Sequence, residues 1–194
     1  MYRVWVTGYR AYELSVFQDN DPKVKVIKNV LKKALIERLN NHSDEFWVIS
    51  GPQMGVERWG IEVAHELKKT YPQLKTSIMD PYAQVAARWK AENQEKLMAT
   101  LQRVDFHASV SNQSYQSPQQ LQNYQRFMLE HTDELLTVFD VDRESESEQV
   151  SKPSWDYRAA LKYQENHDYQ LTTIDFDELQ EAAMELNEEQ NPDY

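Results

Sequence analysis

Residues 46–60 read FWVISGPQMGVERWG. An apolar run, Phe46–Ile49, leads into a turn that holds Gly51 and Gly55, and the amphipathic stretch Trp59–Lys69 follows. The chain contains only four glycines, so those in this turn are expected where the backbone bends sharply or approaches another group closely. Because the first amides of a helix point outward without partners, a strand, a glycine turn and a helix start together favour phosphate binding. The stretch predicts a strand–turn–helix unit, and nucleotide binding is the leading hypothesis.

Strand-like and helix-like segments alternate along the rest of the chain. Strands are expected over residues 2–7, 46–49, 74–79, 105–110, 135–139 and 169–174. One helix is expected to begin at Asp21-Pro22 and another after the glycine turn. Further helices are expected over 85–103, in one or two pieces, over 118–131 and over 153–165. A capping box at 175–178 predicts a short last helix. Residues 144–148, ESESE, are expected to form a charged surface loop. This alternation predicts an α/β fold with a mostly parallel sheet of about six strands and helices on both faces.

Polar residues follow most of the expected strands. Right-handed crossovers bring the strand-to-helix turns to one edge of a parallel sheet, and ligands of open α/β sheets bind at that edge. We therefore expect a ligand-binding site formed by Thr7, Gly8, Tyr9, Arg10, Ser50, Gly51, Gly55, Glu57, Asp80 and Tyr115.

Several of these residues have alternative roles. Arg10 suits a phosphate but is equally consistent with an ordinary surface arginine, and Glu57 suits ribose hydroxyls but also the dipole of its own helix. Tyr82 and Tyr115 are candidates for stacking on a base, whereas we expect Trp59 to pack its helix on the sheet. A purely structural role for the glycine turn, in tight turning and close packing, stays open.

The motifs exclude several classes of site. The turn is not a P-loop, because Val56-Glu57 stand where Lys and Ser or Thr would follow the second glycine, and its missing lysine disfavours an ATPase or kinase. The five histidines lack metal-ligand spacing and the chain has no cysteine, so no metal site is expected. The G-x-S-x-G motif that marks the nucleophile of many serine hydrolases is also absent. No catalytic residue is therefore identified, and whether the protein is an enzyme stays open.

Length and charge restrict the class of protein further. The 194 residues fit one domain, which we place at 1–186, followed by a flexible acidic tail at 187–194. A net charge of −11 argues against a nucleic-acid partner, and lysines 23, 25, 28, 32 and 33 are expected to form the solvated face of a helix. No apolar run is long enough for a membrane span and no signal peptide is evident, so a cytoplasmic protein is expected.

Three segments resemble the YpsA-like family of uncharacterised proteins of Gram-positive bacteria. They are residues 7–17, with Thr7-Gly8-Tyr9-Arg10, Glu13-Leu14 and Phe17; residues 50–59, with the run S-G-x-x-x-G-V-E-R-W; and residues 114–118, SYQSP. This family belongs to the SLOG group, which also contains the DNA-processing protein DprA and the cytokinin-activating LOG enzymes. The resemblance implies a Rossmann-like three-layer domain that binds a nucleotide or nucleotide derivative, of which NAD and ADP-ribose are the proposed class. It places Gly51 and Gly55 at the phosphate or ribose, Glu57 on the ribose, and Thr7, Gly8 and Arg10 in the neighbouring wall.

The function expected from all this is a sensor or regulatory protein that binds a small nucleotide-like ligand. One alternative is a hydrolase that cleaves an N-glycosidic bond of a nucleotide, although the LOG signature P-G-G-x-G-T-x-x-E is absent. A second is DprA-like binding of single-stranded DNA, which the charge disfavours. The oligomeric state, including a homo-oligomer, stays open.

Overall fold

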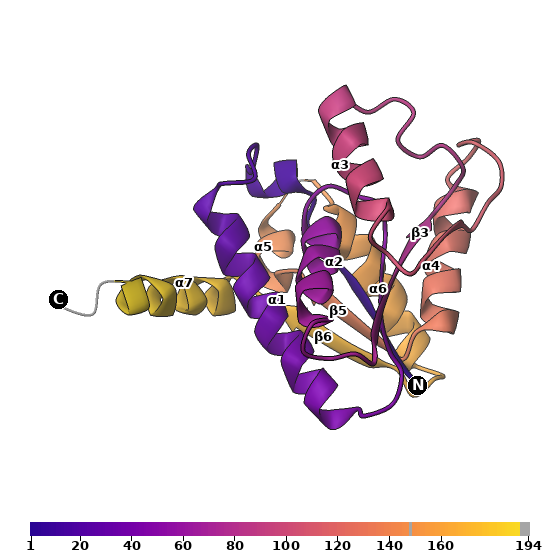
Figure 1. Cartoon of the computed structure of the whole chain (residues 1–194). Helices are drawn as coiled ribbons and strands as arrows, with labels where there is room; N and C mark the ends of the chain where they lie inside the picture. The colour runs from indigo at the N-terminus through magenta and orange to yellow at the C-terminus, as the bar shows by residue number, and fades with distance from the viewer. Residues whose placement is uncertain (148, 191–194) are drawn as a thin grey trace.

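The structure, a computed structural model, describes residues 1–147 and 149–190 (Figure 1). Its strands are β1 (Tyr2–Gly8), β2 (Phe46–Ser50), β3 (Leu74–Asp80), β4 (Phe106–Ser109), β5 (Glu134–Val138) and β6 (Gln170–Ile174). Its α-helices are α1 (Pro22–Asn41), α2 (Val56–Leu67), α3 (Ala91–Leu101), α4 (Gln119–His131), α5 (Val141–Glu146), α6 (Lys152–Gln164) and α7 (Phe176–Gln190). A short 3-10 helix, η1 (Ala11–Leu14), follows β1.

The six strands form one sheet in the order β4-β3-β2-β1-β5-β6, and every pairing is parallel. The chain moves outward from β1 to β4 on one side and then returns to β5 and β6 on the other. The order therefore reverses between β1 and β5, where Thr7 pairs with Thr137. This reversal is the point at which open α/β sheets bind their ligands.

Helices cover both faces of the sheet, which confirms the expected three-layer, Rossmann-like architecture. Val4 and Val6 of β1 point into a core shared with α1 and α2, and Trp5 points the opposite way into a core shared with α4 and α6. The alternation follows from the two-residue period of a strand. Trp59, 2% exposed, packs in the first core, as its position at helical spacing predicts.

Local signals explain the starts of α1, α5 and α7. The Asp21 carboxylate accepts a hydrogen bond from Lys23 N at the start of α1, and Asp175 and Glu178 form the reciprocal bonds of the predicted capping box. The prediction of a loop over 144–148 was wrong for residues 144–146, because α5 extends to Glu146. The side chain of Asp140 caps the start of this helix by accepting a hydrogen bond from Arg143 N. Residue 148 lies outside the described residues.

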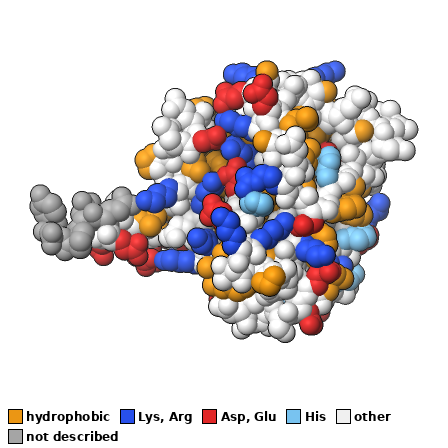
Figure 2. All heavy atoms as spheres, viewed as in Figure 1, with side chains coloured by type: hydrophobic (Ala, Val, Ile, Leu, Met, Phe, Trp, Pro, Cys, Tyr) orange, Lys and Arg blue, Asp and Glu red, His pale blue; other side chains and the backbone are white. Residues whose placement is uncertain are grey.

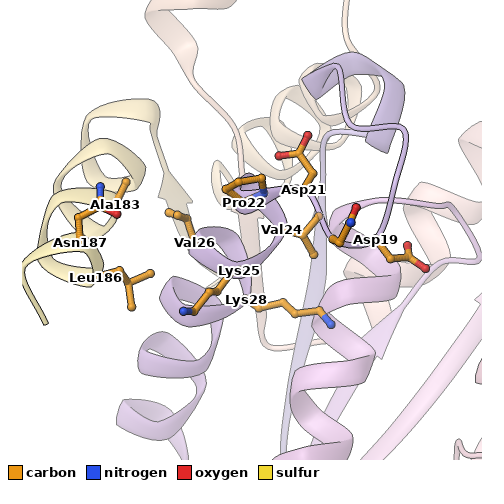
Figure 3. Close-up of a pocket in the computed structure, with 11 residues that line it drawn as sticks. Asp19, Asp21, Pro22, Val24, Lys25, Val26, Lys28, Ala183, Leu186 and Asn187 are labelled. Atoms are coloured by element: carbon orange, nitrogen blue, oxygen red, sulfur yellow. The ribbon is translucent and has the colours of Figure 1, made fainter. Parts of the chain in front are cut away.

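The last helix is longer than expected. α7 continues to Gln190, so residues 187–190 of the expected tail are helical, and residues 191–194 lie outside the described residues. The helix projects away from the rest of the molecule in Figure 1. Near its middle it faces α1 across a cleft of about 640 Å³, into which Val26 and Leu186 point (Figure 3). This cleft contains none of the expected site residues.

The five lysines of α1 form a solvated helix face, as expected. Figure 2 shows Lys and Arg side chains gathered over α1 and α2. Part of this charge is neutralised locally, because Lys28 pairs with Glu62 of α2 and Lys33 pairs with Glu185 of α7. Among the described residues, none of the helices is long and apolar enough to cross a membrane.

The buried face of α1 provides a test of the fold. Leu31 is fully buried beneath this helix, so we expect Leu31→Ala to lower the free energy of unfolding by about 2–5 kcal/mol, through lost transfer free energy and a residual cavity. The neighbouring exposed position serves as the control, since Lys32→Ala should change stability by less than about 0.5 kcal/mol. Urea unfolding followed by circular dichroism measures both, and equal losses would contradict the assigned face.

Candidate functional site

A cleft of about 490 Å³ opens at the carboxyl edge of the sheet, beside the point where the strand order reverses. Its walls come from the turns after β1, β2 and β3 and from helices α4 and α6. Arg10 and Glu57 are the two expected site residues that line it, and Tyr82, the other stacking candidate, lies in its wall. Below, this space is called the first cleft.

A half-buried lysine forms the floor of the first cleft. Lys152, the first residue of α6, directs its ammonium group to Glu57 and to Asp156, with 2.8 Å between Nζ and Asp156 Oδ2. The Thr7 hydroxyl accepts from the same Nζ at 2.5 Å and lies 3.0 Å from Glu57 Oε1 and 3.1 Å from Asp156 Oδ2. The floor thus joins β1, α2 and α6 through one cation and two carboxylates.

The electrostatics of the floor favour the charged form of Lys152. Burial by itself lowers the pKa of a lysine, but the attraction of the Asp156 and Glu57 carboxylates outweighs it and raises the Lys152 pKa above its ordinary value. One ammonium and two carboxylates leave the floor with a net charge of −1. A floor with this charge suits hydroxyl groups, which donate hydrogen bonds, better than phosphate oxygens.

Glu57 uses both carboxylate oxygens within the protein. Oε1 accepts from Thr7 and Lys152, and Oε2 accepts from Gln53 N at 2.9 Å. The side chain is therefore 1% exposed and holds the glycine turn against the floor. Gly51 is needed for this contact, because a Cβ added there would lie 2.4 Å from Glu57 Oε2 and 2.8 Å from the Tyr124 hydroxyl.

The Tyr124 hydroxyl is a buried polar group of the site without a hydrogen-bond partner among the residues that the structure describes. Burial, together with the nearby carboxylates of Glu57, Asp156 and Asp80, raises its pKa well above the ordinary value. The group consequently keeps its proton at neutral pH and is available as a donor.

The turn after β1 is fixed to the same region by Glu13. Its carboxylate accepts from Arg10 N at 2.7 Å and from Lys152 N at 3.0 Å, so it satisfies the first amide of α6. Gly55 fixes the turn after β2. Its φ of +123° suits only glycine, and its backbone forms a bridge with Arg10. A Cβ on Gly55 would meet Ala11 N and Tyr9 O at 2.6 Å.

The other expected residues lie around the first cleft without lining it. Gly8 packs against Val56, the Tyr9 hydroxyl accepts from Asp140 N, and Ser50 donates to Val6 O, so all three hold the carboxyl ends of strands together. Tyr115 is 51% exposed and packs on the ring of Tyr82, with 5.2 Å between centroids, which places it next to the mouth.

Asp80 belongs to a separate pair at the end of β3. Its Oδ2 lies 2.8 Å from His107 Nε2, while its Oδ1 is buried without a hydrogen-bond partner among the described residues. Burial raises the pKa of Asp80, and the bond to His107 opposes that shift. In the same described part of the chain, no group of three or more His, Asp or Glu side chains is placed to hold a metal ion.

Sequence reasoning missed the residues contributed by α4 and α6. These are Leu121, Gln122, Tyr124, Gln125, Lys152, Trp155 and Asp156, all of which line the first cleft. Lys152 lies 95 residues from Glu57, and nothing local in either segment indicates the contact. The available signal was the Lys152–Asp156 pair at i,i+4, on the helix start that Pro153 marks.

The fold and the cleft define a Rossmann-like protein with a candidate site at the carboxyl edge of a parallel sheet. The family model for YpsA, described as the YspA SLOG family, matches residues 4–179. A UPF0398 protein of Limosilactobacillus reuteri is 55% identical, over 98% of this chain and 97% of the relative. A UPF0398 protein of Pediococcus pentosaceus is 49% identical, over 95% and 96% respectively. The chain therefore belongs to the YpsA family of the SLOG group, which confirms the resemblance of its motifs.

The floor provides a test by substitution. Lys152→Met leaves Glu57 and Asp156 buried without their cation, so we expect it to lower the free energy of unfolding by about 3–5 kcal/mol. The control is Lys33→Met, because Lys33 and its partner Glu185 are 61% and 60% exposed and should lose no measurable stability. Chemical unfolding of both variants measures the two changes in the free energy of unfolding. A Lys152→Met protein as stable as the parent would contradict a buried ion cluster.

Proposed function

We propose that the protein binds a nucleotide or nucleotide derivative of the NAD or ADP-ribose class in the first cleft, as a sensor or regulatory domain. The observation that carries the proposal is the division of this cleft into a hydrogen-bonding floor and an aromatic rim. Tyr124 supplies a buried unpartnered donor on the floor side, and Tyr82 and Trp155 line the wall. The volume of about 490 Å³ lies in the range of ordinary small-molecule sites.

The rim supports a base as the apolar part of the ligand. Trp155 is 57% exposed although it is a large aromatic residue, and Leu121 beside it in the lining is also exposed. Exposed apolar side chains gathered around a concavity mark binding sites. Stacking of a base on the Trp155 indole would place the attached ribose toward the floor.

A panel of ligands tests the proposal. NAD, ADP-ribose and AMP at a hundred times their dissociation constants should stabilise the folded state by about 2.7 kcal/mol, which raises the melting temperature by several degrees in a chain of this length. Trp155→Ala should weaken binding at least tenfold with little change in the melting temperature of the unliganded protein, because the indole is exposed. Leu161→Ala, on the same helix and outside the first cleft, is the matched control. No shift with any of the three at millimolar concentration would overturn the proposal.

A second candidate function is hydrolysis of an N-glycosidic bond. It is favoured by the two carboxylates, Glu57 and Asp156, that flank one hydroxyl at the floor. In this reaction water adds its oxygen to C1′ of the ribose as the bond to the base breaks. The adenine of AMP leaves with a proton from the water, whereas the nicotinamide of NAD leaves as a neutral base and the proton is released to solvent. The positive charge that develops on the sugar would be stabilised by a floor of net charge −1.

Product analysis separates binding from hydrolysis. If the protein is a hydrolase, chromatography after incubation with NAD or AMP shows release of the free base, and Glu57→Gln abolishes release while the far-ultraviolet circular dichroism spectrum is retained. Ligand binding without any released base after prolonged incubation would leave the binding protein as the function and exclude the hydrolase for these substrates.

A further inference from the structure

A second cleft of about 510 Å³ lies against the other side of the glycine turn. It shares the side chains of Arg10 and Gln53 with the first cleft, so these two residues form the ridge between the two spaces. Gly55 and Met54 line it from the turn, and the start of α3 lines it from the opposite side. None of the functions discussed above uses this second cleft.

Cations outnumber carboxylates in the lining of the second cleft, whereas carboxylates outnumber cations in the protein as a whole. Its lining includes two carboxylates, Asp19 and Glu92, and four cations, Arg10, Arg58, Lys90 and Lys96. Three of these cations already have carboxylate partners: Arg10 pairs with Glu13, Arg58 with Asp19 and Glu62, and Lys96 with Asp19 and Glu92. Among the described residues, Lys90 is the cation of this lining without an ion pair, so it is the one most available to an anionic ligand.

Aromatic side chains in the same lining are left exposed. Phe17 is 79% exposed and Tyr12 is 57% exposed, and Trp89 lines the cleft near them. The guanidinium carbon of Arg10 stands 4.7 Å from the centre of the Tyr12 ring. Rings beside cations on one concave surface match a ligand that is both planar and anionic, as a nucleotide is.

Arg10 connects the two clefts chemically as well as spatially. One of its terminal nitrogens donates to Glu13 Oε1 at 3.1 Å, whereas its Nε is buried and has no hydrogen-bond partner among the described residues. A guanidinium in this state retains a donor for phosphate oxygens, which it binds in a fork geometry. Phosphate groups on the ridge would meet Arg10, away from the carboxylates of the floor.

From these observations we infer that the second cleft binds the second half of a two-part ligand. The ligand class is two ribonucleotide units joined by a diphosphate, with one unit in the first cleft, the diphosphate on the Arg10–Gln53 ridge, and the second base against Phe17 and Trp89. The inference rests on the proposed function, since it assumes a nucleotide unit in the first cleft.

Isothermal titration calorimetry with NAD and AMP on the 194-residue chain tests the inference. Phe17→Ala and Lys90→Ala both change exposed side chains of the second cleft. Each should weaken NAD binding about tenfold and change AMP binding less than twofold, because AMP fills only the first cleft. Trp155→Ala should weaken both ligands. Phe106→Ala is the matched control, since this exposed phenylalanine on β4 lines neither cleft and should leave both affinities unchanged.

The outcomes separate the two proposals. If both ligands bind and the two second-cleft variants leave NAD affinity unchanged, the second cleft is no subsite, while the proposed function stands. If those variants weaken AMP as much as NAD, the assignment of one unit to each cleft is overturned. If neither ligand binds the parent protein, the proposed function fails and the inference fails with it.

Discussion

The contact on which the rest of the site depends is that of the Lys152 ammonium with the buried carboxylates of Glu57 and Asp156. Its partners come from both sides of the reversal in strand order, since Glu57 follows β2 and Asp156 lies on the helix between β5 and β6. Each ion alone would be costly to bury, and together with Thr7 they satisfy one another. The cluster therefore fixes α2 and α6 relative to the central strand, and the first cleft is the space left above it.

This cluster changes the role of the glycine turn. The turn has no lysine of its own, which disfavours a P-loop, and the fold instead supplies a lysine from a helix far along the chain. That lysine is neutralised by two carboxylates and does not serve as a free charge for a terminal phosphate. Glu57 has its oxygens occupied by Thr7, Lys152 and the backbone of the turn, so it positions the turn more directly than it reaches a ligand.

The sequence contained most of the fold and only part of the site, for a physical reason. Strand runs, the Asp21 cap and the Asp175–Glu178 capping box are local, and the structure confirms them. α5 was missed because its charged residues resemble a loop, and its stability depends on the Asp140 cap and on Arg143 packing over Phe176, 4.6 Å from the ring centre. The turns after β1 and β2 were found from their glycines. Lys152, Tyr124 and Trp155 were not, because only tertiary packing brings α4 and α6 to that edge.

The distribution of charge around the ridge gives the two clefts different preferences. The two carboxylates at the floor of the first cleft disfavour phosphate there, whereas the second cleft offers the exposed Lys90. Arg10 stands between them, held in place by Glu13 and by the backbone bridge to Gly55. The proposed ligand, with hydroxyls at one end and phosphate in the middle, would therefore lie with its hydroxyls over Lys152 and its phosphates at Arg10. The glycine turn fixes that orientation, because its backbone, tied to both Arg10 and Glu57, sets the position of the ridge relative to the floor.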